Sequence, residues 1–371
     1  MRVLHVVFSL DAGGMENGVV NVSRALDPRG FEFHACCLAR GGKFAERLPH
    51  PERVRVLGKA EGFSPRTIRS LAACIRSVAP DVIHTHNFGP LIYTALAAPG
   101  RKNRILHGEH AELTPAELSP RRKLLRRFLY RRVARVHAVS ASLRDKLIAQ
   151  GFPAQKICLV ANGVDCAQFA PGLKDEARAV TGLPREAIVL GLVGRFGEFK
   201  RHTELIGAFE RLAPAGRDLR LVFIGGGGPL ESSVRERAAA SPCASRIHIA
   251  GFQPDPRPWY RSLDLLVLPS VNEGLSNALL EAMACGIPAL AHAACGNADV
   301  IGDSANGYLR DLGSPQALDT ALAHALRSPD RLPALGQAGR TTVEANFSLL
   351  ATAAGYERLY RELAGIRPPG N

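Results

Sequence analysis

The stretch Leu263-Asp-Leu-Leu-Val-Leu-Pro-Ser-Val-Asn-Glu-Gly-Leu-Ser-Asn-Ala-Leu-Leu-Glu-Ala-Met-Ala-Cys-Gly286 joins a strand to a helix through a short polar loop. Leu263 to Leu268 is apolar, has the length of a buried strand and is closed by Pro269. Ser276 is a typical N-cap residue, and Gly286 with Pro288 predicts the end of the helix. A buried strand leading directly into a helix is the unit from which parallel α/β sheets are built.

Two carboxylates lie on either side of this helix start. Glu273 falls in the loop, and Glu281 falls inside the helix. The free backbone N–H groups of a helix start favour an anion. A diphosphate could therefore dock there, with Glu273 accepting hydrogen bonds from sugar hydroxyls and Glu281 from a ribose diol. The alternative is a surface loop whose glutamate only stabilises the helix dipole, and this stretch by itself favours neither interpretation.

Strand-like and helix-like runs alternate along the whole chain, which predicts an α/β fold. Its 371 residues, 46% of them hydrophobic, suffice for two cores. We expect two Rossmann-like doubly wound domains facing a central cleft, at residues 1–170 and 171–345, and a C-terminal helix in 346–371 that packs back across the first domain. The expected strands are Val3–Phe8, Phe31–Leu38, Val54–Leu57, Asp81–His86, Arg104–His107, Val136–Val139, Ile157–Val160, Ala187–Val193, Leu219–Ile224, Arg246–Ile249, Leu263–Leu268 and Ile287–Ala291.

Gly-rich or polar loops follow several of these strands, at the sheet edge where α/β proteins bind ligands. Arg195 and Lys200 flank one such loop and could neutralise a diphosphate, or could be two solvated cations in a turn. Gly227 lies in a second loop that could add N–H donors or be a mere turn. Gly13-Gly-Met-Glu16, after the first strand, is either a tight turn or a loop lining the acceptor side.

No Asp-x-Asp sequence is present, so we expect neither a metal nor another cofactor to hold the diphosphate. Four histidines invite a metal-site hypothesis instead, because His84 and His86 share a strand face while His107 and His110 follow the next strand. Their acidic partner would be Glu109 or Glu112. A metal-dependent hydrolase is the corresponding rival function, although a polar cleft also needs histidines as hydrogen-bonding groups.

The net charge of +13 indicates a basic surface that faces something anionic. Residues 121–135 carry eight basic and no acidic side chains, interleaved with Leu124, Leu125, Phe128, Leu129 and Val133. This basic amphipathic helix favours docking on an anionic membrane surface. A nucleic acid is the competing partner, but no recognition module accompanies the helix.

The remaining composition favours a cytoplasmic protein. The eight cysteines are scattered without a Cys-x-x-Cys pair, so neither a disulfide framework nor a zinc ribbon is indicated. Val3–Phe8 is interrupted by His5 and lacks a signal-peptide cleavage site, which favours a first strand over a leader. Since no stretch approaches 18 apolar residues, we expect peripheral contact with the inner face of the cytoplasmic membrane.

With these motifs in hand, the chain resembles the retaining glycosyltransferases of family 4, which have the two-domain GT-B fold. The resemblance covers essentially the whole length, and its most specific part is Pro269–Pro288, which looks like the family's Glu-x₇-Glu donor signature. Supporting matches are Gly13-Gly-Met-Glu16, His110, Ala138-Val-Ser140, Asn162-Gly-Val-Asp165, the pair Arg195 and Lys200, and Gly226-Gly-Gly-Pro229.

The resemblance implies transfer of a hexosyl unit from a nucleotide diphosphate sugar to a lipid-linked or oligosaccharide acceptor, with retention and without a metal. It implies that Arg195 and Lys200 bind the diphosphate, Glu281 the ribose and Glu273 the sugar. His110 would contact the reacting sugar and handle a proton. The other implied positions are Phe252 at the nucleobase, Gly227, Gly274, Leu275 and Ser276 along the donor, and Gly13, Gly14 and Glu16 on the acceptor side.

The opening His5–Gly18 with Gly108-Glu-His110 further looks like the subgroup associated with exosortase and PEP-CTERM exopolysaccharide loci. One departure from the family concerns Cys295-Gly-Asn-Ala-Asp299, where many relatives have Gly-Gly and a glutamate. The identity of the sugar could differ as a result. A nucleotide-sugar epimerase on the same fold is the nearest alternative function.

Overall fold

The computed structural model describes residues 1–213 and 217–366, and the chain divides into two compact units. Unit 1 comprises Met1–Asn162 and Leu349–Asn371, and unit 2 comprises Gly163–Ser348. The boundary between the units thus lies at 162/163 rather than at the expected 170/171. The reason is that the segment after Asn162 forms its hydrogen bonds within unit 2. Val164 N–H donates to Phe347 O (2.9 Å), and Arg261 Nε donates to Ala170 O (2.8 Å). Residues 367–371 of the expected tail lie outside the described residues.

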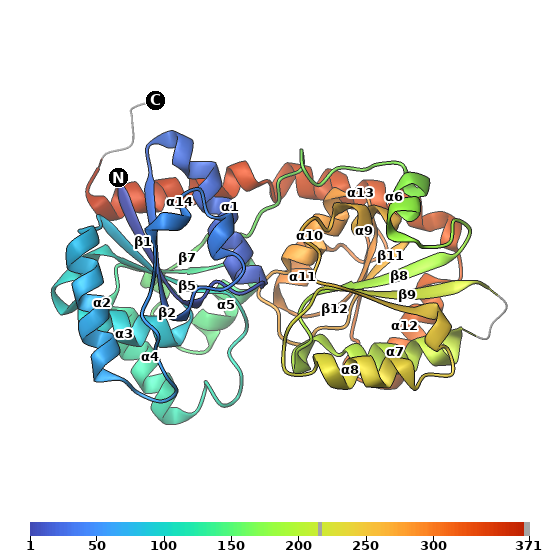
Figure 1. The fold of residues 1–371 in the computed structure, drawn as a ribbon, viewed down its shortest axis with the longest axis horizontal. Helices are drawn as coiled ribbons and strands as arrows, with labels where there is room; N and C mark the ends of the chain where they lie inside the picture. Colours follow the sequence, from blue (N-terminus) through green and yellow to red (C-terminus); the bar gives the residue numbers. More distant parts are fainter. Residues whose placement is uncertain (214–216, 367–371) are drawn as a thin grey trace. The chain divides into compact units, whose positions relative to one another are not determined.

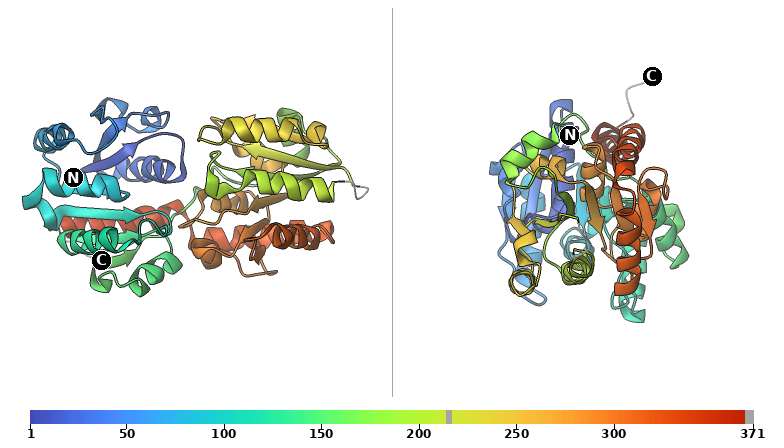
Figure 2. Two further views of the ribbon diagram at one scale, coloured as in Figure 1. Left: turned by 90° about the horizontal axis from the view of Figure 1, so that it is seen from below. Right: turned by 90° about the vertical axis from the view of Figure 1, so that its right-hand side faces the viewer.

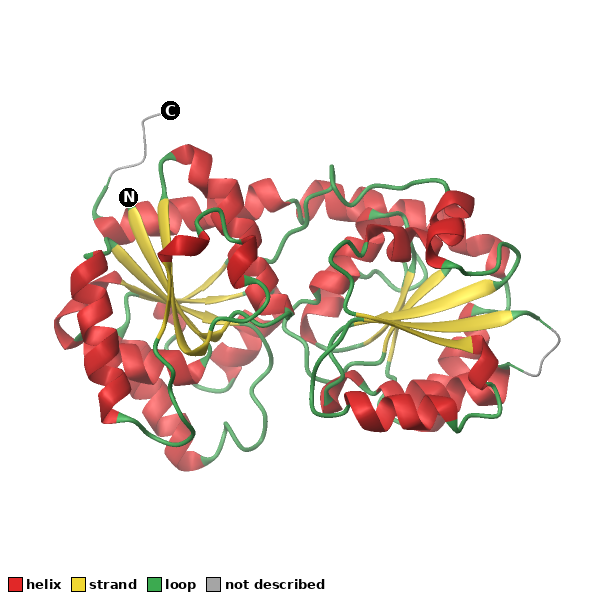
Figure 3. Ribbon diagram, in the orientation of Figure 1, coloured by secondary structure: helices red, strands yellow, loops and turns green. Residues whose placement is uncertain are grey.

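Unit 1 is built on a parallel sheet of seven strands in the order β3-β2-β1-β4-β5-β6-β7. Helices cover both faces of this sheet, with α1 and α14 packed together on one of them (Figures 1 and 3). The strands are β1 Arg2–Ser9, β2 Glu32–Arg40, β3 Val54–Val56, β4 Val82–His86, β5 Ile105–Glu109, β6 Arg135–Ala138 and β7 Ile157–Leu159. The helices are α1 Gly14–Leu26, α2 Pro65–Val78, α3 Phe88–Ala97, α4 Pro120–Arg132, α5 Ala141–Ala149 and α14 Leu349–Ala364.

The C-terminal helix α14 belongs to the core of unit 1. Tyr356, Leu359 and Tyr360 follow one another at helical spacing and are buried against Val3 and Val82 of the sheet. Thr352 Oγ1 donates to Ala161 O (2.9 Å) at the start of the helix. The last long element of the chain therefore completes the domain that the first element began.

Unit 2 repeats the design with six parallel strands in the order β10-β9-β8-β11-β12-β13. Figure 2 shows the strand layer of each unit between layers of helices. The strands are β8 Ile188–Val193, β9 Leu219–Ile224, β10 Ile247–Gly251, β11 Leu265–Leu268, β12 Ala289–His292 and β13 Tyr308–Arg310. The helices are α6 Lys174–Thr181, α7 His202–Leu212, α8 Glu231–Ala239, α9 Arg257–Ser262, α10 Asn277–Ala284, α11 Cys295–Val300, α12 Pro315–Ala325 and α13 Leu332–Asn346.

The predicted α/β fold of two doubly wound sheets is confirmed. Each expected strand has a counterpart that differs by at most two residues at either end, and β13 was not predicted. In both sheets the chain starts in the middle, runs to one edge and then returns to fill the other half. The order reverses between β1 and β4 in unit 1 and between β8 and β11 in unit 2, which are the places where such sheets bind ligands.

Within residues 1–213 and 217–366, no helix is long and apolar enough to cross a membrane.

Candidate functional site

The loops after β8 and β11 meet where the strand order of unit 2 reverses. The Lys200 ammonium forms an ion pair with the Glu273 carboxylate, and the two side chains are 24% and 14% exposed. Val271 N–H donates to Phe199 O (3.1 Å), which ties the two loops together through their backbones. The structure thus brings together two of the predicted site residues, which lie 73 positions apart in the sequence.

The glycine-rich loops after β8 and β9 also lie against each other. Gly228 has a φ of +109°, and its Cα faces the Phe196 carbonyl so closely that a side chain would overlap it. Phe196 N–H donates to Gly227 O (2.9 Å), and Leu230 N–H donates to Phe196 O (3.1 Å). Gly227 N–H points the other way and donates to Glu231 Oε2 (2.6 Å) at the start of α8. In this structure the backbone N–H of Gly227 is therefore occupied by a carboxylate of the chain itself.

Glu281 lies on α10 and is nearly buried. Tyr260, on α9, donates its hydroxyl to Glu281 Oε2 (2.7 Å). Burial and the neighbouring carboxylate raise the pKa of Tyr260 well above its usual value, so the tyrosine stays protonated and remains a donor. The sequence analysis did not single out Tyr260, because its contact with Glu281 joins residues that lie 21 positions apart.

The other predicted donor-side residues line the same edge of the sheet. Ser276 takes the N-cap position of α10, but its side chain makes no capping hydrogen bond. Gly274 and Leu275 precede it and are buried. Phe252 follows β10 and lies against Gly226, where an added Cβ would come within 3.2 Å of the Phe252 Cβ. Arg195 is exposed, and among the described residues its guanidinium has no hydrogen-bond or ion-pair partner.

Three buried polar oxygens in this region were not predicted. Ser270 Oγ, Asn272 Oδ1 and Asn297 Oδ1 have no hydrogen-bond partner among the described residues. Asn272 directly precedes Glu273. Asn297 donates through Nδ2 to His292 O (3.0 Å), and the neighbouring Gly296 packs against the Gly274 carbonyl. Buried polar groups without partners are rare in folded proteins, and these three lie in or beside the loop that carries Glu273.

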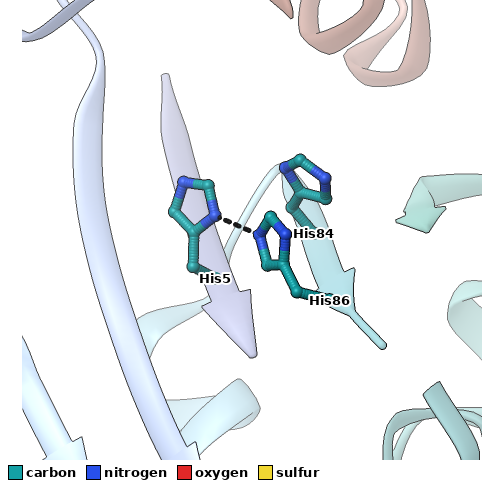
Figure 4. A group of neighbouring side chains, drawn as sticks. All are labelled: His5, His84 and His86. Carbon is teal, nitrogen blue, oxygen red and sulfur yellow. Dashed lines mark hydrogen bonds between the residues drawn. The ribbon is translucent and has the colours of Figure 1, made fainter. Parts of the chain in front are cut away.

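In unit 1 the reversal point between β1 and β4 is occupied by imidazole rings. His5 Nδ1 shares a hydrogen bond with His86 Nε2 (2.9 Å), and His86 Nδ1 shares one with His110 Nε2 (2.9 Å). His84 lies beside His86, with ring centroids 4.0 Å apart (Figure 4), and bonds instead to Tyr360 OH (2.8 Å) and His137 Nε2 (2.9 Å).

The four histidines of the metal-site hypothesis do not form one group. His107 turns away and bonds to Thr85 Oγ1 (2.9 Å) and Glu109 Oε1 (3.0 Å). Among the described residues, the set with ligand atoms near enough for a metal ion is His5, His84 and His86, within 4.8 Å of one another. His5 was missed because we interpreted it only as an interruption of an apolar strand.

Next to His110, Glu109 anchors helix α4. Burial by itself would raise the pKa of Glu109, but the Arg126 guanidinium and hydrogen bonds from His107 and Tyr130 outweigh it and lower the pKa to about 2. Arg126 is 1% exposed and also pairs with Glu117 (3.0 Å). Its expected role as a cation of the membrane-facing surface is therefore wrong, because its side chain points inward.

On the acceptor side of the prediction, Gly13 is the N-cap of α1 and Glu16 lies in its first turn. The Glu16 carboxylate folds back over Gly13, so that a side chain at position 13 would collide with it. Asn17 N–H donates to Gly13 O (2.9 Å), which makes this the regular start of a helix.

Comparison with known proteins agrees with this arrangement. Residues 12–168 match Glycosyltransferase Family 4, and residues 174–342 match Glycosyl transferases group 1. The chain belongs to the glycosyltransferases. It is 29% identical to a D-inositol 3-phosphate glycosyltransferase of Xylanimonas cellulosilytica, over 96% of this chain and 94% of that one. It is 27% identical to the putative glycosyltransferase EpsF of Bacillus subtilis, over 78% of each.

Solved structures place this glycosyltransferase in the GT-B fold. Anabaena Alr3699/HepE in complex with UDP-glucose superimposes with a TM-score of 0.84 at 18% identity, over 98% of this chain and all of that one. Sucrose-phosphate synthase from Thermosynechococcus elongatus gives a TM-score of 0.83 at 20% identity, with the same coverage.

The buried histidines make a prediction about acid stability. Burial lowers the pKa of His5 to about 3 and that of His110 to about 4, and it lowers the pKa values of His84, His86 and His137 well below 6.5. Because the unfolded chain then binds more protons below pH 6.5, the free energy of unfolding falls as the pH decreases, by about 1.4 kcal/mol per pH unit for each such histidine.

We therefore expect the denaturant midpoint of unit 1 to be constant above pH 7 and to decline steeply between pH 6.5 and 5. Chemical denaturation followed by circular dichroism at several pH values measures this. Recovery on return to pH 7.5 is the control for aggregation. An unchanged midpoint down to pH 5 would contradict the neutral, buried state of these rings.

Proposed function

We propose that the protein transfers a hexosyl unit from a nucleotide diphosphate sugar to a lipid-linked glycan, with retention at the anomeric carbon and without a metal. The observation that carries the proposal is the Lys200–Glu273 pair at the reversal point of the unit 2 sheet. A cation and a carboxylate held together there suit a ligand that is anionic at its phosphates and rich in hydroxyls at its sugar.

The diphosphate is the part of the donor for which unit 2 supplies positive charge. The Lys200 ammonium is already paired with the Glu273 carboxylate, so an incoming diphosphate competes with that carboxylate for the ammonium. Arg195 supplies a second cation, and Gly227 N–H, which already donates to a carboxylate oxygen, supplies a backbone donor. The complexes of HepE with UDP and UDP-glucose support a nucleotide sugar as the donor class.

The remaining donor contacts follow the same edge of the sheet. In the proposal Glu281, oriented by Tyr260, accepts the ribose hydroxyls, and Phe252 contacts the nucleobase. Glu273 accepts sugar hydroxyls while Gly274, Leu275 and Ser276 line the donor.

The chemistry is a substitution that needs no protein nucleophile. The acceptor oxygen forms a bond to the anomeric carbon on the face from which the diphosphate departs, the carbon–oxygen bond to the diphosphate breaks, and the acceptor's proton passes to a departing phosphate oxygen. Charge accumulates on the diphosphate, so Arg195 and Lys200 contribute most by stabilising it. His110 contacts the reacting sugar, and Gly13, Gly14 and Glu16 lie on the acceptor side.

The acceptor and the membrane are proposed from helix α4. Leu124, Leu125 and Phe128 are 70%, 41% and 49% exposed, and they project among exposed cations. These cations are Arg121, Arg122, Arg127, Arg131 and Arg132. An apolar strip framed by arginines suits an anionic lipid surface, where a lipid-linked acceptor resides. The resemblance to the exosortase-associated subgroup is the ground for a proposed role in exopolysaccharide synthesis.

Substitution of the ion pair tests the site. Lys200→Ala and Glu273→Ala should each lower kcat/KM by about 10²–10³-fold, the effect of removing one group that stabilises transition-state charge. Sugar transfer is measured with a panel of nucleotide sugars, and the donor class is found first by thermal shift. Lys174→Ala is the matched control, because Lys174 pairs with Asp264 (2.6 Å) on the surface of the same unit. Near-normal rates in both site variants would refute the assignment.

Metal dependence is tested with the same assay. The chain has no Asp-x-Asp sequence, and arginine and lysine side chains take the place of a divalent ion in the proposal. Transfer should therefore keep its rate in excess EDTA, with a metal-dependent glycosyltransferase assayed in parallel as the control. A strict requirement for Mg²⁺ or Mn²⁺ would count against the mechanism.

Charge reversal on α4 tests the membrane surface. Each basic side chain near an anionic bilayer contributes about 1 kcal/mol, so Arg127→Glu with Arg131→Glu should weaken binding to phosphatidylserine-containing vesicles by at least about tenfold. Co-sedimentation with the vesicles measures the binding. Arg66→Glu with Arg69→Glu on α2 changes the net charge equally elsewhere on the same unit and should have a smaller effect. Equal losses in the two double variants would make α4 an ordinary solvated surface.

A further inference from the structure

Three imidazole rings in unit 1 are joined end to end. His5 on β1 bonds to His86 on β4, and His86 bonds to His110 after β5, with both nitrogen–nitrogen distances at 2.9 Å. Figure 4 shows the first of these bonds as a dashed line. At the inner end, His5 Nε2 is buried without a partner among the described residues. At the outer end, His110 is partly exposed.

The three rings must adopt their tautomers together. A neutral imidazole has one N–H and one bare nitrogen, and a hydrogen bond between two rings needs one of each. Two arrangements satisfy both bonds. In the first, every ring carries its proton on Nδ1, so that His110 presents Nδ1–H outward and His5 keeps a bare Nε2. In the second, every proton lies on Nε2, so that His5 buries an N–H and His110 presents a bare Nδ1.

The inner end distinguishes the two arrangements. The second leaves His5 with a buried N–H for which the described residues offer no acceptor, and folded proteins avoid this more strictly than an unused lone pair. We propose that His5 and His86 are positioning residues that hold His110 in the Nδ1–H tautomer, so that its ring meets the substrate as a hydrogen-bond donor and not as a base. The identity of that substrate rests on the proposed function, whereas the tautomer does not.

The contacts of the neighbouring rings favour hydrogen bonds between imidazoles over ligation of a metal ion. His84 completes the group of three that could hold an ion, but its nitrogens are already bonded to Tyr360 and His137. The separation of 2.9 Å between His5 Nδ1 and His86 Nε2 suits a shared proton. Two nitrogens bound to one tetrahedral zinc lie about 3.3 Å apart. The group also contains no carboxylate to offset a divalent charge.

The consequence for catalysis is that His110 keeps its proton throughout the transfer. A ring that presents Nδ1–H cannot take the proton of the acceptor hydroxyl, which agrees with delivery of that proton to the departing phosphate oxygen. The expected contribution of His110 is therefore a hydrogen bond to an oxygen of the reacting sugar.

The tautomer can be observed in the wild-type protein without any substrate. Protein labelled with ¹⁵N-histidine at pH 7.5 gives long-range ¹H–¹⁵N spectra in which protonated and bare ring nitrogens differ, and a His110→Gln variant assigns the signals. We expect a protonated Nδ1 and a bare Nε2 for His110, which is the less favoured form of a free histidine side chain. A protonated Nε2, averaging between the two forms, or stoichiometric zinc bound by His5, His84 and His86 would overturn the proposal. Because no substrate is present, a failure of the proposed function leaves this result unaffected.

Variants at position 86 test the link between the rings. His86→Phe removes the donor to His110 and should release the Nδ1–H tautomer, whereas His86→Asn places an amide N–H near the former Nδ1 and should retain it. His84→Phe, a change in the adjacent ring that does not bond to His110, is the control and should leave the His110 signals in place.

In the transfer assay we expect His86→Phe to lower kcat at least tenfold with the donor KM unchanged, and His86→Asn to recover most of it. Retention of the Nδ1–H form in His86→Phe, or its loss in His84→Phe, would contradict the proposal, and the wild-type spectrum remains decisive if a variant does not fold.

Discussion

The reversal of strand order in each parallel sheet is the constraint on which the rest of the structure depends. Helices cover both faces of a doubly wound sheet, so polar side chains are admitted at the carboxyl ends of the strands, and the loops diverge most where neighbouring strands lead to opposite faces. In unit 2 this point carries Lys200 and Glu273, which no local pattern connects. In unit 1 it carries His5 and His86, from strands that are also neighbours only in space.

The two reversal points differ in their electrostatic character. The one in unit 2 is charged and partly exposed, which is compatible with the proposed diphosphate ligand. The one in unit 1 is neutral, because burial keeps its imidazoles unprotonated, and its rings are joined by hydrogen bonds to one another. A neutral network of this kind orients a group at its exposed end without introducing a charge that the core would have to compensate.

Helix α4 has one face exposed to solvent and an opposite face that contacts the buried Glu109. Leu124, Leu125 and Phe128 face solvent among arginines, whereas Arg126 reaches inward to Glu109, the residue before His110. A charged side chain in a basic run is expected to be solvated, and Arg126 departs from that rule because the Glu109 carboxylate replaces its hydration. The helix thus has a fixed orientation, with one set of cations exposed on the surface and Arg126 buried in an ion pair.

The sequence by itself determined the two α/β domains, nearly all of their strands, the glycine loops and the strand–loop–helix unit that carries Glu273 and Glu281, because these features depend on local periodicity, caps and spacing. It could not determine that Lys200 pairs with Glu273, that Tyr260 orients Glu281, or that His5 rather than His107 joins His84 and His86. Those relations arise from the order in which the strands are laid side by side, which brings together residues tens of positions apart. The inward direction of Arg126 was decided in the same way, since identical residues along one helix differ only in what lies opposite them.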